Sequence, residues 1–345
     1  MTEFSLFSLM GYRARGTALG DILADTVQLV QHAEASGFDG AWFAEHHFSN
    51  YCVCPSPLLM VSHCAALTSR IRLGPAVVVV PLYQPVRLVE EIGMVAELCG
   101  ERLLLGIGSG YQPYEFDRFG ADLAQSKAEL DEFIRLMYTA FASETFSFDG
   151  GKTRLPETSI ATRPTRLPPI WVAGDSEATH RLAARRGYTP IITGRGAGSD
   201  YLAEMRARID KTYAAEGLPT NSHPLGILRF ACVTETAAET ETYVENARYQ
   251  LRLAAALRNR DEAMDGGMMI EALAPGEQSL EDMARNLPVG DAETVAERLT
   301  ADIKAAGASH VLLNIQSGAS TMTQARRTMD VFAREIRPAI ERALG

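Results

Sequence analysis

The stretch IRLGPAVVVV, residues 71–80, is apolar along its whole length apart from one arginine. A strand exposed on one face alternates apolar and polar residues, whereas a strand covered on both faces reads as a continuous apolar run. Four consecutive valines end the stretch, and β-branched residues favour strands over helices. It therefore predicts a strand covered on both faces, as in the parallel sheet of an α/β protein.

Similar short apolar runs alternate with longer helical patterns along the chain. The expected strands are 4–10, 40–44, 71–80, 102–107, 169–173, 189–193, 225–233 and 310–315. The expected helices are 21–36, 56–68, 85–99, 127–142, 177–186, 200–216, 237–257 and 323–342. Alternation of this kind implies a parallel sheet, and eight units favour a closed (β/α)8 TIM barrel with insertions. An open doubly wound sheet is the alternative.

Two stretches interrupt the repeat, and no linker divides the chain, so we expect one domain over residues 1–345. Residues 146–167 are rich in Gly, Pro, Thr and Arg and predict an excursion before the fifth strand. Residues 259–286 are polar and weakly periodic. Long loops in compact domains are commonly lids, so this segment is interpreted as a mobile lid or a surface insertion.

Charge and cysteine content limit the classes of function. The chain has 345 residues and a net charge of −10, which argues against binding to nucleic acid or to anionic membranes. No run approaches the roughly 20 apolar residues that a membrane-spanning helix needs. Five scattered cysteines indicate reduced thiols. We expect a soluble cytoplasmic protein.

Glu45, His46 and His47 directly follow the second expected strand. Active sites of parallel barrels lie at the C-terminal ends of the strands, so these residues are candidates for chemistry. A catalytic zinc needs about three protein ligands, and at most two of these neighbours can converge, so we expect no metal site. A cofactor or substrate site and a buried, hydrogen-bonded histidine pair remain as interpretations.

Two glycine-containing strand ends are candidates for cofactor binding. In AGDSEATHRLAARRG, residues 173–187, a strand leads through a glycine to Asp175 or Ser176 as an N-cap, and then to a helix. Such helix starts bind phosphate, although plain capping explains the pattern equally well. GIGSG, residues 106–110, lacks the Gly-x-Gly-x-x-Gly spacing, which excludes a Rossmann fold. Its glycines allow a flat ring or a phosphate to approach the backbone.

Four segments together resemble the bacterial luciferase-like flavin monooxygenases. They are GFDGAWFAEHHF (37–48), IRLGPAVVVVPLYQPVRLVEE (71–91), GERLLLGIGSGYQPYEFDRFG (100–120) and PIWVAGDSEATHRLAARRG (169–187). The resemblance runs from about residue 4 to residue 340. It implies a (β/α)8 barrel and reduced FMN, usually delivered by a separate flavin reductase. It also implies that O2 is used, through a flavin C4a-peroxide, to oxygenate a small organic substrate, and a homodimer formed through helices 56–68 and 85–99.

The resemblance also assigns roles to individual positions. His46 matches the family histidine that acts as base and hydrogen-bonds at the peroxide site, with Glu45 and His47 beside the flavin. Ala76 matches a position where such proteins often have a non-prolyl cis peptide under the isoalloxazine ring. The remaining positions expected to contact the cofactor are Ser109, Tyr111, Ala173, Gly174, Asp175, Ser176 and Thr179.

Two positions depart from the family pattern. Gly108 stands where luciferase has its reactive cysteine, which fits a non-luminous relative. Ser109 stands where many members have an arginine near the FMN phosphate, and Arg195 and Arg181 are candidate substitutes. Two alternatives stay open: hydride transfer with the deazaflavin F420 on the same fold, and a non-catalytic flavin-binding protein. The sequence does not identify the substrate.

Overall fold

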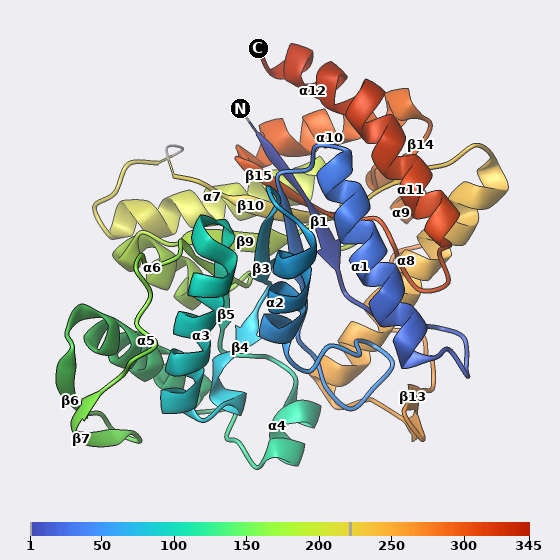
Figure 1. Cartoon of the computed structure of the whole chain (residues 1–345). Helices are drawn as coiled ribbons and strands as arrows, with labels where there is room; N and C mark the ends of the chain where they lie inside the picture. The colour runs from blue at the N-terminus through green and yellow to red at the C-terminus, as the bar shows by residue number, and fades with distance from the viewer. Residues whose placement is uncertain (1, 221–222) are drawn as a thin grey trace.

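The computed structural model describes residues 2–220 and 223–345 and shows a parallel barrel surrounded by helices (Figure 1). The nine strands of the main sheet follow the order β3-β2-β1-β15-β10-β9-β8-β5-β4. The two end strands, β3 and β4, are successive pieces of the same chain segment, so the sheet nearly closes on itself. The predicted (β/α)8 barrel is confirmed.

Apart from α10, which the sequence patterns did not predict, and the divided elements described below, the barrel elements lie within a few residues of the expected ranges. The strands are β1 (Glu3–Ser8), β2 (Gly40–Phe43), β3 (Arg72–Pro75), β4 (Val78–Val79), β5 (Leu105–Gly108), β8 (Ile170–Ala173), β9 (Thr189–Thr193), β10 (Gly226–Phe230) and β15 (His310–Asn314). The helices around them are α1 (Leu19–Ala35), α2 (Pro57–Leu67), α3 (Pro85–Cys99), α5 (Ser126–Ala142), α6 (Glu177–Arg186), α7 (Ser199–Ala215), α8 (Ala237–Asn259), α10 (Ala292–Ala306), α11 (Met322–Val331) and α12 (Arg337–Leu344).

Local sequence explains where several helices begin. Proline occupies the first turn of α2 and α3, where its missing N–H costs no helical hydrogen bond. Ser176, Thr236 and Thr321 cap α6, α8 and α11, and each side chain accepts a hydrogen bond from the N–H three residues on. These caps satisfy amides that the helix itself leaves without a partner.

Three expected elements are divided. Residues 71–80 form β3 and β4, separated by a cis peptide bond between Ala76 and Val77, because beyond Phe43 the neighbouring strand β2 has ended. Residues 225–233 form β10 and β11 (Cys232–Val233), and β11 leaves the barrel to pair with β14 (Val289–Gly290). Residues 323–342 contain a π turn before Pro338, which has no N–H to continue the α-helical pattern.

The insertions contain structure that the sequence patterns did not predict. The excursion at 146–167 contains most of a hairpin, β6 (Thr145–Asp149) with β7 (Arg154–Ser159). The expected lid segment contains a second hairpin, β12 (Met264–Asp265) with β13 (Met268–Met269), and helix α9 (Leu280–Asn286). A short helix, α4 (Pro113–Phe119), follows β5. Both α4 and β13 lie at the C-terminal end of the barrel strands (Figure 1).

Aromatic side chains fill the middle of the barrel. The rings of Trp42 and Trp171 meet edge to face at 5.0 Å, and Trp171 meets the His310 ring at 4.6 Å. His310 Nε2 is 2.9 Å from Glu3, at the N-terminal end of the strands. A packed interior of this kind leaves the C-terminal end of the barrel for ligands.

Two further properties of the chain bear on the expectations from sequence. All five cysteines are buried and free. Over residues 2–220 and 223–345, no helix has the length and apolar character needed to cross a bilayer.

Candidate functional site

The wall formed by β3, β5 and β8 is lined by very small side chains at its C-terminal end. Gly74, Gly106 and Trp171 face the barrel interior, because a Cβ at Gly74 would lie 2.8 Å from the Trp42 ring and Gly106 pairs with Trp171. Side chains alternate along a strand, so the next inward positions are Ala76, Gly108 and Ala173. Ala76, Gly108 and Ala173, named here the small-residue wall, carry at most a methyl group, and at Gly108 the Val77 side chain already lies 2.6 Å from where a Cβ would be.

His46 is held by a buried carboxylate on α4. His46 Nδ1 lies 3.0 Å from Glu115 Oε1, which also accepts a hydrogen bond of 2.7 Å from the His47 backbone N–H. Glu115 is 1% exposed. Because a carboxylate oxygen accepts hydrogen bonds, Nδ1 carries the proton and Nε2 is left on the opposite side of the ring. Nε2 makes no hydrogen bond with the residues that the structure describes.

His47 turns to a second buried carboxylate, that of Glu45. His47 Nε2 donates to Glu45 Oε1 at 3.2 Å, while Glu45 Oε2 accepts from the Val79 N–H at 3.1 Å and the Tyr83 hydroxyl at 2.9 Å. Burial raises the pKa of the Glu45 carboxyl, and these hydrogen bonds oppose the rise. Glu45 therefore ties the end of β2 to β4, just past the cis peptide.

Two tyrosines surround the His46 ring. The Tyr51 ring lies 4.9 Å from it and the Tyr111 ring 5.8 Å, the latter edge to face. Gln112 Nε2 donates to the Tyr111 hydroxyl at 3.0 Å, and the Arg258 guanidinium lies over the Tyr111 ring. Tyr111 therefore lies beside His46.

The start of α6 presents a group of donors next to the small-residue wall. Ser176 Oγ accepts from the Thr179 N–H at 3.2 Å and lies 2.9 Å from Thr179 Oγ1. The amides of Glu177 and Ala178 make no hydrogen bond with the described part of the chain. Gly174 has φ +147°, and a Cβ there would lie 3.1 Å from Thr179 Oγ1, so the turn favours glycine.

Asp175 does not cap α6, although Asp175 and Ser176 were both predicted as candidate N-caps. Its carboxylate instead binds Thr193 on β9 and the Arg195 guanidinium, at 3.2 Å and 2.9 Å. Arg195 thus lies near the start of α6, where a substitute phosphate ligand was expected, but its guanidinium is already paired with the Asp175 carboxylate. Arg181, the other candidate, is paired with Glu177 and Glu216. Exposed pairs of this kind are weak, so an incoming anion competes with them readily.

The residues singled out from the sequence lie at the ends of four adjacent strand positions, β2, β3/β4, β5 and β8. They are Glu45, His46 and His47 after β2, Ala76 between β3 and β4, Ser109 and Tyr111 after β5, and Ala173, Gly174, Asp175, Ser176 and Thr179 at β8. The end of β2, with the histidines, and the end of β8, with the start of α6, are three strand spacings apart, which is roughly 14 Å. Glu115 was missed, because nothing in its own short segment marks it as the partner of His46.

The comparisons with known proteins show the family of the chain. The model of the luciferase-like monooxygenase family matches residues 2–310. The chain belongs to the luciferase-like monooxygenase family. No three His, Cys, Asp or Glu side chains in the described ranges come together as a possible metal site.

Two relatives cover nearly the whole chain. An uncharacterized protein of Sinorhizobium fredii is 36% identical over 99% of both chains. The oxygenase component of a flavin-dependent trigonelline monooxygenase of Acinetobacter baylyi is 24% identical over 98% of this chain and 95% of its own.

Two solved structures show the same fold. The oxygenating constituent of 3,6-diketocamphane monooxygenase from Pseudomonas putida, solved with FMN, has a TM-score of 0.79 at 20% identity, with 98% of both chains covered. An F420-dependent secondary alcohol dehydrogenase, solved with an F420–acetone adduct, has a TM-score of 0.74 at 16% identity and covers 98% of this chain and 99% of its own.

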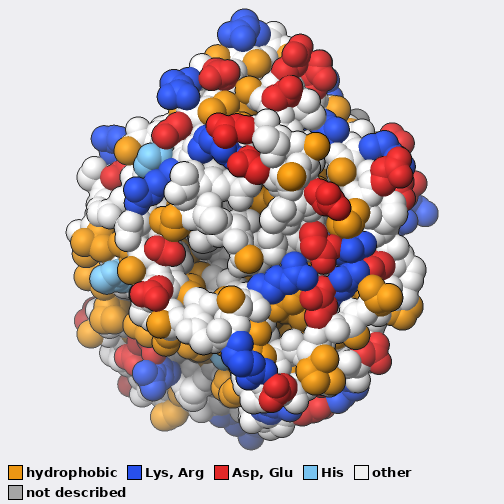
Figure 2. Space-filling model, turned by 90° about the vertical axis from the view of Figure 1, so that its right-hand side faces the viewer, with side chains coloured by type: hydrophobic (Ala, Val, Ile, Leu, Met, Phe, Trp, Pro, Cys, Tyr) orange, Lys and Arg blue, Asp and Glu red, His pale blue; other side chains and the backbone are white. Residues whose placement is uncertain are grey.

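The segment 259–286 is docked on the rest of the protein through ion pairs. Arg252 on α8 binds Glu271 at 2.6 Å and Glu277 at 2.5 Å, and Arg13 binds Glu271 at 3.0 Å. Figure 2 shows basic and acidic side chains adjoining one another on the face that carries α8. These contacts place the lid segment beside the C-terminal ends of the barrel strands.

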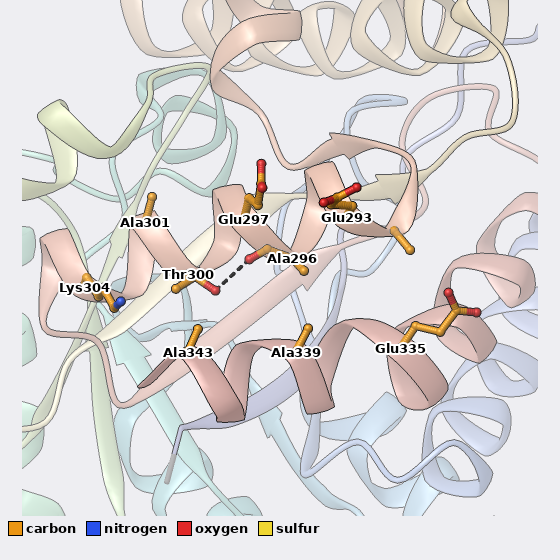
Figure 3. A pocket seen from close by; sticks show the side chains of 10 residues that line it. Glu293, Ala296, Glu297, Thr300, Ala301, Lys304, Glu335, Ala339 and Ala343 are labelled. Carbon is orange, nitrogen blue, oxygen red and sulfur yellow. Dashed lines mark hydrogen bonds between the residues drawn. The ribbon is translucent and has the colours of Figure 1, made fainter. Parts of the chain in front are cut away.

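Two grooves on the outer surface lie away from these residues. One, of about 630 Å³, runs between α10 and α12 and is lined largely by alanines, with Glu293, Glu297 and Lys304 along α10 (Figure 3). The other, of about 620 Å³, lies between α1 and α2 and is mostly apolar. Neither contains a residue that the sequence marked as functional.

The Arg252–Glu277 pair gives the lid segment an expected pH dependence. The hydrogen bond from Arg252 lowers the Glu277 pKa from its ordinary value of 4.5 to about 2. A lowered carboxyl pKa stabilises the fold above pH 4.5, and that contribution is lost as the pH falls from 4.5 towards 2. We expect the wild type to unfold at higher urea concentrations than Glu277→Gln at neutral pH, with the difference shrinking over this range. A difference independent of pH would contradict this assignment.

Proposed function

We propose that the protein is the oxygenase component of a two-component monooxygenase. In this proposal it binds reduced FMN supplied by a separate reductase and uses O2 to oxygenate a small organic substrate. The observation that carries the proposal is the arrangement of an imidazole with a free Nε2 at one end of the small-residue wall and a cluster of phosphate-type donors at the other.

The residues present fit a phosphorylated flavin. Ala76 and Ala173 carry only a methyl group at their strand ends, so a planar ring could lie against them where larger side chains would take up the space. The amides, hydroxyls and positive dipole end at the start of α6 suit the phosphate. When bound, the reduced flavin supplies two electrons, so that one atom of O2 enters the substrate and the other leaves as water.

The chain's own contribution is proton handling and exclusion of water. Glu115 fixes the proton of His46 on Nδ1, so Nε2 is the nitrogen that exchanges a proton with a bound molecule. Glu45 and His47 hold the end of β2 in place beneath it. The docked segment 259–286 covers the same end of the barrel, which keeps water from the reacting atoms.

Hydride transfer with F420 is the competing function on this fold. The F420-dependent dehydrogenase shows that the same barrel accepts a deazaflavin. F420 carries an acidic tail and so needs more positive charge than FMN does, whereas the charges of Arg195 and Arg181 near the start of α6 are each offset by a carboxylate. An absorbance titration with FMN and with F420, followed by oxygen uptake with the reduced form of each, separates the two functions. Uptake that requires reduced FMN supports our proposal, and F420-dependent reduction without oxygen contradicts it.

We expect His46→Ala to slow product formation by roughly 10²-fold or more, the scale of losing one acid–base group. Glu115→Gln should cause a smaller loss, because His46 stays in place but its orientation is less firmly fixed. His32 on α1, which pairs with Asp330 on the outer surface, supplies the control His32→Ala, which should keep wild-type turnover. Stopped-flow turnover with reduced FMN and O2 measures all three. Normal turnover of His46→Ala would exclude the assigned role.

The phosphate assignment is tested by comparing FMN with riboflavin, which lacks the phosphate. Ser176→Ala should weaken FMN binding about tenfold or more, the scale of a hydrogen bond to a charged group, and leave riboflavin binding unchanged. Thr321→Ala, which removes the N-cap of α11 away from the site, controls for general loss of a cap. Equal weakening of both ligands by Ser176→Ala would show that Ser176 acts on the fold and not on the phosphate.

We also propose a homodimer formed through α2 and α3. Four large apolar side chains are exposed on these adjacent helices: Leu59 (70%), Leu67 (42%), Met94 (53%) and Leu98 (59%). Apolar patches of this kind mark association surfaces. Leu59→Asp with Leu98→Asp should convert the dimer to a monomer in sedimentation velocity, whereas Leu218→Asp, at an exposed leucine elsewhere, should not. A monomeric wild type would end the proposal.

A further inference from the structure

Asn50 connects the β12–β13 hairpin, called here the lid hairpin, to the segment that carries His46 and His47. It is fully buried, four residues after His46. Its backbone N–H donates to the Gly267 carbonyl at 2.9 Å, and its side-chain Oδ1 accepts from the Met269 N–H at 2.8 Å. Asn50 therefore binds the β12–β13 hairpin at two points, one through its backbone and one through its side chain.

The other side of Asn50 is attached to the barrel. Its Nδ2 donates to the Tyr12 carbonyl at 2.8 Å and to the Tyr249 hydroxyl at 2.6 Å. Its carbonyl accepts from the Tyr12 N–H at 3.0 Å. Both amide hydrogens and the amide oxygen are thus used, which fixes the orientation of the side chain. An aspartate could not make the same contacts, since it has no N–H to donate.

The turn around Asn50 transmits its position to His46. Ser49 and Cys52 form an antiparallel bridge across the turn, and the His46 N–H donates to the Cys54 carbonyl. Tyr51, the next residue after Asn50, packs its ring 4.9 Å from the His46 ring. A displacement of Asn50 therefore moves the tyrosine that contacts the imidazole.

We propose that Asn50 is a positioning residue that couples docking of the lid hairpin to the placement of the His46 imidazole. With the hairpin docked, Tyr51 holds the ring against Glu115; with the hairpin lifted, that support is lost. The functional meaning of this coupling rests on the role proposed above for His46. The ion pairs from Arg252 to Glu271 and Glu277 hold a later part of the lid and do not touch Asn50.

The test measures the lid and the histidine separately by NMR. In Asn50→Ala, exchange of the Met269 amide with solvent should be about tenfold to hundredfold faster, because a buried hydrogen bond is lost. The ring chemical shifts of His46 should change in the same variant. In the control Arg252→Gln, amides of residues 271–277 should exchange faster while the His46 ring shifts stay at their wild-type values.

A faster Met269 amide with unchanged His46 shifts in Asn50→Ala would overturn the proposal, and so would changed His46 shifts in Arg252→Gln. Tyr249→Phe removes only the hydroxyl that accepts from Asn50, and it should produce smaller changes in the same two signals. If Asn50→Ala does not fold, the same two signals in Tyr249→Phe test the proposal in its place. Neither signal depends on turnover, so a wild type that does not consume oxygen with reduced FMN would refute the proposed function and leave this test intact.

Discussion

Two buried carboxylates determine the geometry at the mouth of the barrel. A carboxylate removed from water is costly unless donors surround it. Glu115 meets this condition by accepting from the His46 ring and the His47 backbone, and Glu45 by accepting from His47, Val79 and Tyr83. Each histidine is drawn to a different carboxylate, so the two neighbours point in different directions. The end of β2, the strand break at β3/β4 and helix α4 are held together by these contacts.

Much of the fold could be predicted because its signals are local. Continuous apolar runs mark the strands, helical periodicity marks the helices, and their alternation implies the barrel. The positions of His46 and Ser176 followed from one further rule, that parallel barrels act at the C-terminal ends of their strands. Helix α10 was nevertheless missed, although its buried residues Val295, Leu299 and Ile303 recur at helical spacing.

The remaining features depend on contacts between distant segments. Glu115 lies 69 residues from His46 and on a seven-residue helix. Asp175 turns from α6 to β9 because Thr193 and Arg195 offer it donors there, which the local capping pattern does not reveal. The lid segment is docked by Arg13 and Arg252, whose charges say nothing by themselves about their partners. The sequence therefore predicted most of the secondary structure, but it did not predict which side chains from distant segments would pair.

The burial of every cysteine has a chemical consequence for the proposed function, in which the chain would work beside oxygen and reduced flavin. Burial raises the pKa of Cys54 and Cys64 to about 12 and that of Cys99 and Cys232 to about 11, and it also raises that of Cys52. The thiolate is the nucleophilic form of sulfur, and oxidation to sulfenic acid begins from it. At neutral pH a raised thiol pKa and burial both disfavour reaction of these cysteines with hydrogen peroxide or alkylating reagents.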